Sequence, residues 1–448
     1  MKKLLLAGVA AFAVGASAHA DGHINLTFPI GDGEFNWASY EEFAAANDFA
    51  GEAIEITGPW TGQDAELVNS MLDYFEQATG ATVNYSGSDS FENDIVIAAR
   101  AGSAPNLAVF PQPGLAADMA AQGFLTPLAE GSDAWMRENY AAGQSWVDLG
   151  SFADRDGNDQ YFGFFYKVDV KSIVWYSESA FDEAGYDIPE TMEELKELTQ
   201  QIVDDGGTPW CIGLGSGAAT GWPATDWVED MMLRTQAPET YDAWVANEIS
   251  FNDPAVVGAI EEFGFFAKND DFVQGGAQAV ATTDFRESPN GLFAVPPECY
   301  MHRQASFIPT FFPEGNDSAF FYFPAYEGRD LGSPVLGAGT MWAITNPSDA
   351  ASALLEFLKT PVAHEVWMAQ SGFLTPHNGV NTDLYANDML KGLGEILLGA
   401  STFRFDASDL MPGEIGAGAF WTGMVDYVTG EDAEAVATGI QQRWDGIQ

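Results

Sequence analysis

Apolar and polar residues alternate or recur at helical spacing through residues 54–128, and this pattern opens an α/β unit. The predicted elements are a strand over 54–57, a helix over 64–79, a strand over 81–85, a helix over 91–101 and a strand over 107–110. Gly58-Pro59 ends the first strand, and Gly80 ends the first helix. This order is typical of a parallel sheet with right-handed crossovers, in which ligands bind at the carboxyl ends of the strands.

The remainder of the chain continues with helices and a few strands. The pattern predicts strands over 172–176 and 334–344, and helices over 192–205, 226–234, 254–267, 349–359 and 433–447. Thr191 and Glu194 form a capping box at the start of the helix that they precede. Residues 208–225 are rich in Gly, Ala, Thr and Trp, which indicates loops over a site rather than core.

Five short segments, in order and at similar spacing, match one protein family. They are residues 75–80, 101–106, 121–128, 182–195 and 420–424. Through them the chain, from about residue 52 to its end, resembles the family 1 extracellular solute-binding proteins, the receptors that feed sugars to ABC importers and include maltose-binding protein. The resemblance implies an α/β fold of the periplasmic-binding-protein type, with two α/β lobes joined by three hinge crossings.

The resemblance also implies how the chain divides between the lobes. Residues 52–166 and 338–373 are expected to form lobe 1, and residues 167–337 and 374–448 to form lobe 2. Residues 21–51 depart from maltose-binding protein and are expected to form an N-terminal extension, whose position over one lobe or the other the sequence leaves open.

The start of the chain has the features of a secretory signal peptide. Met1-Lys2-Lys3 is followed by an apolar run and by Ala18-His19-Ala20, a cleavage site of the small-x-small type. We expect cleavage after Ala20 and a protein located in the periplasm; the alternative is a buried N-terminal helix. No later segment has 18 uninterrupted apolar residues, as a membrane-spanning helix would need.

The composition is strongly acidic. Without Lys2 and Lys3, 15 basic residues face 66 acidic ones, so the mature chain has a net charge of −51. Nucleic acid and anionic membranes are unfavourable partners, because phosphate binding requires basic patches. The charge suits a solvated surface in a salty medium; the alternative is adaptation to a cationic ligand.

Cys211 and Cys299 are the only cysteines in the sequence. In an oxidising periplasm they are expected to form a disulfide, and the alternative is two small buried apolar side chains. Neither interpretation involves catalysis.

Sequence signatures of enzymes are absent. The chain has no G-x-S-x-G, H-E-x-x-H, Walker A or dinucleotide-binding motif, and its histidines have no metal-ligand spacing. We therefore expect no catalytic residue, no metal and no cofactor. Paired carboxylates such as Asp406 and Asp409 leave a secreted glycosidase as a minor alternative.

Aromatic and polar side chains occur together at predicted strand ends and in loops. A sugar ring offers C–H faces that stack on aromatic rings and a rim of hydroxyls that bond carboxylates, amides and guanidinium groups. The candidate ligand-binding residues are Trp60, Asp89, Gln112, Lys167, Trp222, Asp226, Tyr300, Arg303, Trp342, Asp409 and Trp421.

Trp421 is the strongest candidate, because Phe420-Trp421 resembles the word in maltose-binding protein whose Trp stacks on a sugar ring. Other candidates have structural alternatives. Asp226 and Asp409 are also suited to capping a helix or to a turn. Lys167 is also suited to a hinge surface, and Arg303 to pairing with nearby carboxylates.

The resemblance narrows the expected function. The surroundings of Cys211 and Cys299 and residues 406–412 are most similar to the α-glucoside receptors for sucrose, trehalose and maltose. We expect a monomer that binds a neutral sugar between its lobes and presents it to membrane permease subunits. The alternative within the binding class is a receptor for a cationic solute such as a polyamine or betaine; Arg303 or Arg404 in the pocket would disfavour it.

Overall fold

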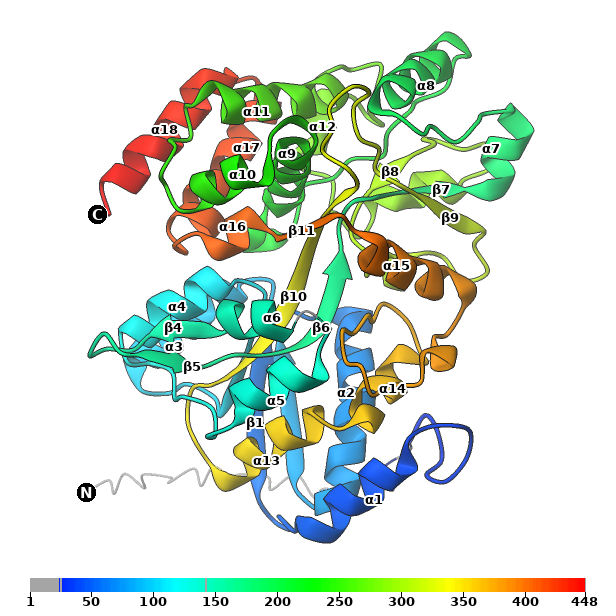
Figure 1. Ribbon diagram of the computed structural model, residues 1–448. Coiled ribbons are helices and arrows are strands. Elements are labelled where there is room, and N and C mark those ends of the chain that lie inside the picture. The colour runs from blue at the N-terminus through cyan, green and yellow to red at the C-terminus, as the bar shows by residue number, and fades with distance from the viewer. Residues whose placement is uncertain (1–23, 25, 142, 448) are drawn as a thin grey trace, which may run out of the picture.

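The computed structural model describes residues 24, 26–141 and 143–447, and the chain forms two lobes (Figure 1). The predicted signal peptide lies outside the described residues. None of the described helices is long and apolar enough to cross a membrane.

Lobe 1 is built on a mixed sheet that contains both parallel and antiparallel pairs of strands. Its helices and strands are α1 Trp37–Ala46, β1 Ala53–Gly58, α2 Gly62–Thr79, β2 Thr82–Gly87, α3 Phe91–Ala101, β3 Leu107–Phe110, α4 Pro113–Ala121, α5 Ser132–Asn139, α6 Gly143–Leu149, β4 Ser151–Ala153, β5 Asp159–Tyr161, α13 Asp349–Leu358 and α14 Pro361–Met368. Strand β1 pairs in parallel with β2 and with β3, with Ile54 opposite Val83 and Ile56 opposite Leu107. The predicted strand-helix-strand-helix-strand unit is confirmed.

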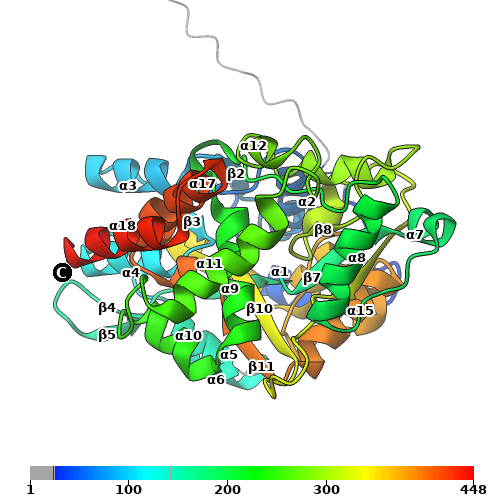
Figure 2. The same cartoon turned by 90° about the horizontal axis from the view of Figure 1, so that it is seen from above.

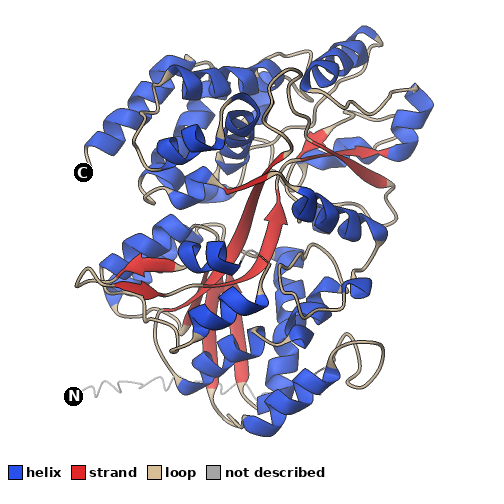
Figure 3. Ribbon diagram, in the orientation of Figure 1, coloured by secondary structure: helices blue, strands red, loops and turns tan. Residues whose placement is uncertain are grey.

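Two long strands, β6 Phe164–Val170 and β10 Pro334–Ile344, run from one lobe into the other (Figures 1 and 3). They pair antiparallel, with Gly337 opposite Val170 and Thr340 opposite Lys167. Every position of both strands is buried. Two adjacent strands that are buried throughout join the lobes as a stiff pair.

Lobe 2 is mainly helical around a small sheet. Its elements are β7 Ile173–Ser177, α7 Glu178–Ala184, α8 Met192–Asp204, η1 Gly217–Ala219, α9 Trp222–Thr235, α10 Pro238–Val245, α11 Pro254–Ala267, α12 Ala277–Val280, η2 Ser288–Phe293, β8 His302–Arg303, η3 Ile308–Phe311, β9 Ser318–Tyr322, α15 Asp388–Gly399, β11 Thr402–Phe405, α16 Ala407–Leu410, the π-helix η5 Ile415–Phe420, α17 Trp421–Thr429 and α18 Ala433–Asp445. Helix α9 begins at Trp222, earlier than the expected 226, because Gly221 and Pro223 provide its start.

The division between the lobes remains a prediction, and the packing supports its first two boundaries. Val168 and Ala338 belong to the lobe 1 core, whereas Val170 and Leu336 belong to lobe 2 clusters. At the third crossing, the hydrogen bonds favour a later position in the chain than the one expected from the sequence. Ala386 N–H still donates to the Met368 carbonyl, and η4 (Thr382–Leu384) lies on this segment, which favours a crossing close to α15 rather than at residue 373.

The N-terminal extension packs on lobe 1, which answers the question of its position that the sequence left open. Helix α1 buries Trp37, whose ring stacks 6.0 Å from that of Tyr74. Phe43 lies 5.1 Å from Phe357 between ring centroids, and the backbone N–H of Asn36 donates to Glu365 at 2.6 Å. In Figure 1 the extension lies at the far end of lobe 1 from lobe 2.

The disulfide between Cys211 and Cys299 is present, so the predicted pairing is confirmed. Both cysteines are buried in a lobe 2 cluster with Trp175 and Leu292. The bond closes a loop of 88 residues that contains α9, α10 and α11.

We predict that the double variant Cys211→Ala, Cys299→Ala is less stable by about 2 to 4 kcal/mol, because the bond restricts the unfolded chain over a long loop. Urea unfolding of the wild type with and without reductant checks this. The reduced wild type should unfold at the midpoint of the variant. Equal midpoints for the oxidised wild type and the variant would contradict the stabilising role.

Candidate functional site

A cavity of about 160 Å³ lies between the lobes. Its lobe 1 wall comes from the segments after three parallel strands: Trp60 after β1, Asp89 after β2 and Gln112 after β3. The carboxyl ends of neighbouring parallel strands meet at one edge of a sheet, which brings these residues together. Helix α9, η3 and the segments around α16 and α17 supply the lobe 2 wall.

Seven of the eleven candidate residues line this cavity. They are Trp60, Asp89, Gln112, Lys167, Trp222, Asp409 and Trp421. Asp89 is 42% exposed in its side chain, whereas the other polar candidates of this set are buried. Ligand contact by any of them remains a prediction.

The other four candidates do not line the cavity. The ring of Trp342 is buried in lobe 1, 6.2 Å from Trp60 between centroids. Tyr300 packs against Tyr186 at 5.3 Å. Arg303 donates to Asp230 at 2.7 Å inside lobe 2, consistent with its alternative role as a partner for carboxylates.

Asp226, the fourth, is bound by a lysine of the cavity wall. Lys171 Nζ lies 2.8 Å from Asp226 Oδ1 and 2.5 Å from Asp406 Oδ2. Burial lowers the pKa of Lys171, but Asp226 and Asp406 more than compensate and raise it well above its usual value. Lys171 is therefore a fixed positive charge in the wall of the cavity.

Asp226, Glu229 and Asp406 also place carboxylate oxygens within 4.8 Å of one another, as a metal site would. Lys171 already pairs with Asp226 and Asp406. Both oxygens of Glu229 accept backbone N–H groups at 3.0 Å, from Ala407 and Ser408. These protein donors occupy the cluster, so it supports no metal assignment.

Three aromatic rings of the cavity wall each face a positively charged side chain of the protein. Lys171 Nζ lies 5.5 Å from the ring centre of Trp222, and Lys167 Nζ lies 5.3 Å from that of Phe307. The guanidinium carbon of Arg286 lies 4.5 Å from the ring centre of Phe285. The cations also have acidic partners, Asp169 for Lys167 and Asp89 for Arg286.

Four lining residues have a buried polar atom without a hydrogen-bond partner among the described residues. The atoms are Asp64 Oδ1, Gln112 Oε1, Thr340 Oγ1 and Trp421 Nε1. Such atoms are rare, because a buried polar group without a partner costs about 1 to 3 kcal/mol. Nine further atoms of this kind lie elsewhere among the described residues, and these four are the ones that line the cavity.

Asp64 is the one carboxylate among these four residues. Its side chain is buried at the start of α2, and burial raises its pKa to about 6, although Lys167 acts in the opposite direction. Asp64 lies in the first turn of α2, where Thr61 is the capping residue and no side chain caps the helix. A carboxyl group with this pKa changes charge in the physiological range.

Several lining residues were missed by sequence reasoning. They are Asp64, Asp169, Lys171, Phe285, Arg286, Phe307, Phe311 and Thr340. Two signals were available: Asp64 follows the end of β1, and Lys171 follows β6. Phe285, Arg286 and Phe307 lie in irregular segments of lobe 2, and Phe311 ends the short helix η3. In such segments the spacing in the sequence does not show which way a side chain points.

Direct contacts hold the lobes together around the cavity. Arg286 Nη2 of lobe 2 lies 2.6 Å from Asp89 Oδ1 of lobe 1. The backbone N–H of Gly413 in lobe 2 donates to Asp118 Oδ2 in lobe 1 at 2.9 Å. The arrangement is therefore that of closed lobes.

Comparison with known proteins identifies the family of the chain. A family described as bacterial extracellular solute-binding proteins matches residues 58–365. Over the full length of both chains, the protein is 59% identical to the alpha-glucosides-binding periplasmic protein AglE of Rhizobium meliloti (strain 1021). It is 42% identical to the osmoprotective compounds-binding protein GgtB of Synechocystis sp. (strain ATCC 27184 / PCC 6803 / Kazusa), over 87% of this chain and 92% of that one.

Solved structures agree in fold. The bacterial solute receptor AcbH, described as preferring β-D-galactopyranose, superposes with a TM-score of 0.76 at 19% identity, covering 88% of this chain and 99% of that one. The maltose-bound T. maritima MalE3 gives 0.67 at 16% identity, covering 88% and 100%. The predicted fold of two α/β lobes is confirmed. The chain belongs to the bacterial extracellular solute-binding proteins, and it is a binding protein rather than an enzyme.

Proposed function

We propose that this protein binds a neutral α-glucoside in the cavity between its lobes and presents it to the permease subunits of an ABC importer. The carrying observation is the group of four unpartnered polar atoms beside aromatic rings. The name of the relative AglE, which is 59% identical over the full length, supports the α-glucoside class.

The unpartnered atoms match the chemistry of a polyol. Asp64 Oδ1 and Gln112 Oε1 need donors, Trp421 Nε1 needs an acceptor, and Thr340 Oγ1 is able to take either role. A sugar hydroxyl donates one hydrogen bond and accepts others, so a ring of hydroxyls can satisfy this mixture. Aromatic walls then cover the C–H faces of the ring.

A cationic solute fits less well, although Arg303 and Arg404 do not line the cavity. The rings of Trp222, Phe285 and Phe307 already face protein cations, which would repel a second positive charge. Asp64 and Asp409 line the cavity without a basic ion-pair partner in the described part of the chain, and burial raises the pKa of each. A partly protonated carboxyl group suits a neutral ligand.

Binding couples to lobe closure in this proposal. Lobe 1 supplies Asp64 and Gln112, whereas lobe 2 supplies Trp222 and Trp421. A ligand that touches both walls stabilises the closed arrangement, and the permease then recognises that arrangement. We further propose that the protein acts as a monomer in the periplasm after cleavage at Ala20, in line with the periplasmic location in the name of AglE.

Calorimetry tests this assignment against a panel of α-glucosides, β-glucosides, a polyamine and betaine. We predict binding of an α-glucoside with an affinity that changes less than about 5-fold between low and high salt. The ligand is neutral, and the half-exposed Arg286–Asp89 pair contributes only about 0 to 1 kcal/mol to closure. Tight binding of a polyamine or betaine, with a steep loss at high salt, would contradict the proposal.

The affinity for the α-glucoside should depend on pH through Asp64. Its pKa is about 6, and a ligand hydroxyl that donates to the carboxylate favours the ionised form. Affinity should therefore rise by about 10-fold from pH 5 to pH 7 in the wild type. In Asp64→Asn, calorimetry at the two pH values should give a difference smaller than this.

Asp73→Asn is the matched control, because Asp73 lies on the same helix, has a raised pKa and does not line the cavity. Its pH profile should follow the wild type. A wild-type profile that is flat from pH 5 to pH 7, or that Asp64→Asn reproduces unchanged, would exclude a role for this carboxylate in ligand binding.

A further inference from the structure

Two irregular segments of lobe 2, residues 211–222 and 280–288, supply one side of the ligand cavity. The lining residues that they contribute are Ser216, Ala219, Trp222, Phe285 and Arg286. The elements that adjoin these segments, α9, α12 and β8, lie in lobe 2, which Figure 2 shows from above. Apart from short helical turns and the first residue of α9, the two segments consist of turns and irregular chain.

Few backbone hydrogen bonds connect the two segments. Leu214 N–H donates to the Val280 carbonyl at 2.9 Å. Gly215 N–H donates to the Thr283 carbonyl, and the Gly215 carbonyl accepts from Phe285 N–H, both at 2.9 Å. Segments with few backbone hydrogen bonds open locally more easily than strands or helices. A further constraint is therefore needed to keep these segments in one arrangement.

The disulfide supplies such a constraint, because it joins the chain on either side of the two segments. Cys211 begins the first segment, and its N–H donates to the Met301 carbonyl at 2.8 Å. Cys299 follows the second segment. A Cβ added at Gly291 would lie 2.4 Å from Cys299 Sγ, so the chain that leads from Phe285 to Cys299 packs closely on the sulfur.

The aromatic rings of the cavity pack on the same buried cluster as the disulfide. Cys211, Cys299 and Phe285 all belong to this cluster. The ring of Trp222 lies 4.9 Å from that of Phe285 between centroids. The aromatic wall of the cavity consists of Trp222, Phe285, Phe307 and Phe311. Because buried side chains are closely packed, a shift of Cys299 displaces this wall.

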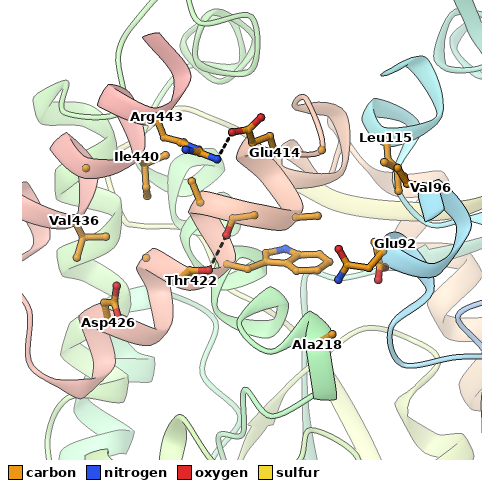
Figure 4. A pocket seen from close by; sticks show the side chains of 18 of the residues that line it. Glu92, Val96, Leu115, Ala218, Glu414, Thr422, Asp426, Val436, Ile440 and Arg443 are labelled. Atoms are coloured by element: carbon orange, nitrogen blue, oxygen red, sulfur yellow. Dashed lines mark hydrogen bonds and ion pairs between the residues drawn. The ribbon is translucent and has the colours of Figure 1, made fainter. Parts of the chain in front are cut away.

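The same two segments also face lobe 1. Arg286 follows Phe285 and lies 2.6 Å from Asp89 of lobe 1. Ala218 of the first segment and Glu92 of lobe 1 line an outer groove between the lobes (Figure 4). The position of these segments therefore affects both the cavity and the meeting of the lobes.

We infer that the Cys211–Cys299 disulfide is a positioning element of the ligand site: it holds the aromatic wall and Arg286 in the arrangement that the ligand meets. This role is separate from the restriction of the unfolded chain. A wall that is ordered before binding costs less to order during binding, so the bond increases affinity. The effect on affinity rests on the proposed function, whereas the effect on the wall does not.

Hydrogen exchange of the ligand-free protein, followed by mass spectrometry, tests the effect on the wall. In the variant Cys211→Ala, Cys299→Ala, the amides of residues 280–288 should exchange at least about 10-fold faster than in the wild type. Leu198→Ala is the matched control, because Leu198 is buried on α8 in a different cluster and lines neither hollow. This large-to-small change lowers global stability, but it should speed exchange over residues 280–288 less than about 3-fold.

Calorimetry with maltose tests the effect on affinity, at a temperature where circular dichroism shows every variant folded. The double cysteine variant should bind maltose at least about 5-fold more weakly than the wild type, and Leu198→Ala should stay within about 2-fold. Wild-type protein reduced with a dithiol, with both thiols verified by alkylation, should match the double variant. This second sample keeps the test decisive if the double variant folds poorly.

Exchange over residues 280–288 that is unchanged in the cysteine variant, or equally fast in Leu198→Ala, would overturn the positioning role and leave the α-glucoside assignment intact. Faster exchange together with an unchanged affinity for maltose would overturn the link between the bond and ligand binding. A wild type that binds no α-glucoside would overturn the proposed function, and hydrogen exchange would still decide whether the disulfide positions the wall.

Discussion

The buried charge of Lys171 is the constraint on which the ligand cavity depends. Lys171 directly follows the crossing strand β6 and is 5% exposed, and a buried charge is tolerated only with close partners. Asp226 and Asp406 supply them from positions 55 and 235 residues away. One interaction thus ties the hinge, helix α9 and the segment after β11 into the floor of the cavity.

The same rule explains the character of the cavity. Lys167, Lys171 and Arg286 all have acidic partners from the protein and aromatic rings beside them. The atoms left without partners are neutral groups or a carboxyl group with a raised pKa. The net charge of −49 therefore describes the chain as a whole, whereas the cavity offers hydrogen bonds rather than an attraction for cations.

Much of the fold could be predicted because buried faces impose their period on the sequence. Helix α11 and strand β10 have the predicted bounds, 254–267 and 334–344. Helix α1 was missed although Asn36 caps it and Trp37, Tyr40 and Phe43 are spaced on its buried face. No family resemblance covers that segment.

The site could be predicted only in part, for geometric reasons. Parallel strands bring their carboxyl ends together, so the sequence was sufficient to predict that Trp60, Asp89 and Gln112 lie at one site. Strand β10 is buried at every position, so no alternation of polar and apolar residues showed that Thr340, rather than Trp342, lines the cavity. Arg303 finds its partner Asp230 far away in the sequence, which spacing does not reveal.

A crystal structure of the protein with maltose tests the central claim most directly, since it shows where the sugar lies and which atoms it satisfies. The account predicts the sugar in the cavity between the lobes, with hydroxyls bonded to Asp64 Oδ1 and Gln112 Oε1 and with Trp421 beside a sugar ring. Sugar density confined to another surface, with these polar atoms still unpartnered in closed lobes, would contradict it.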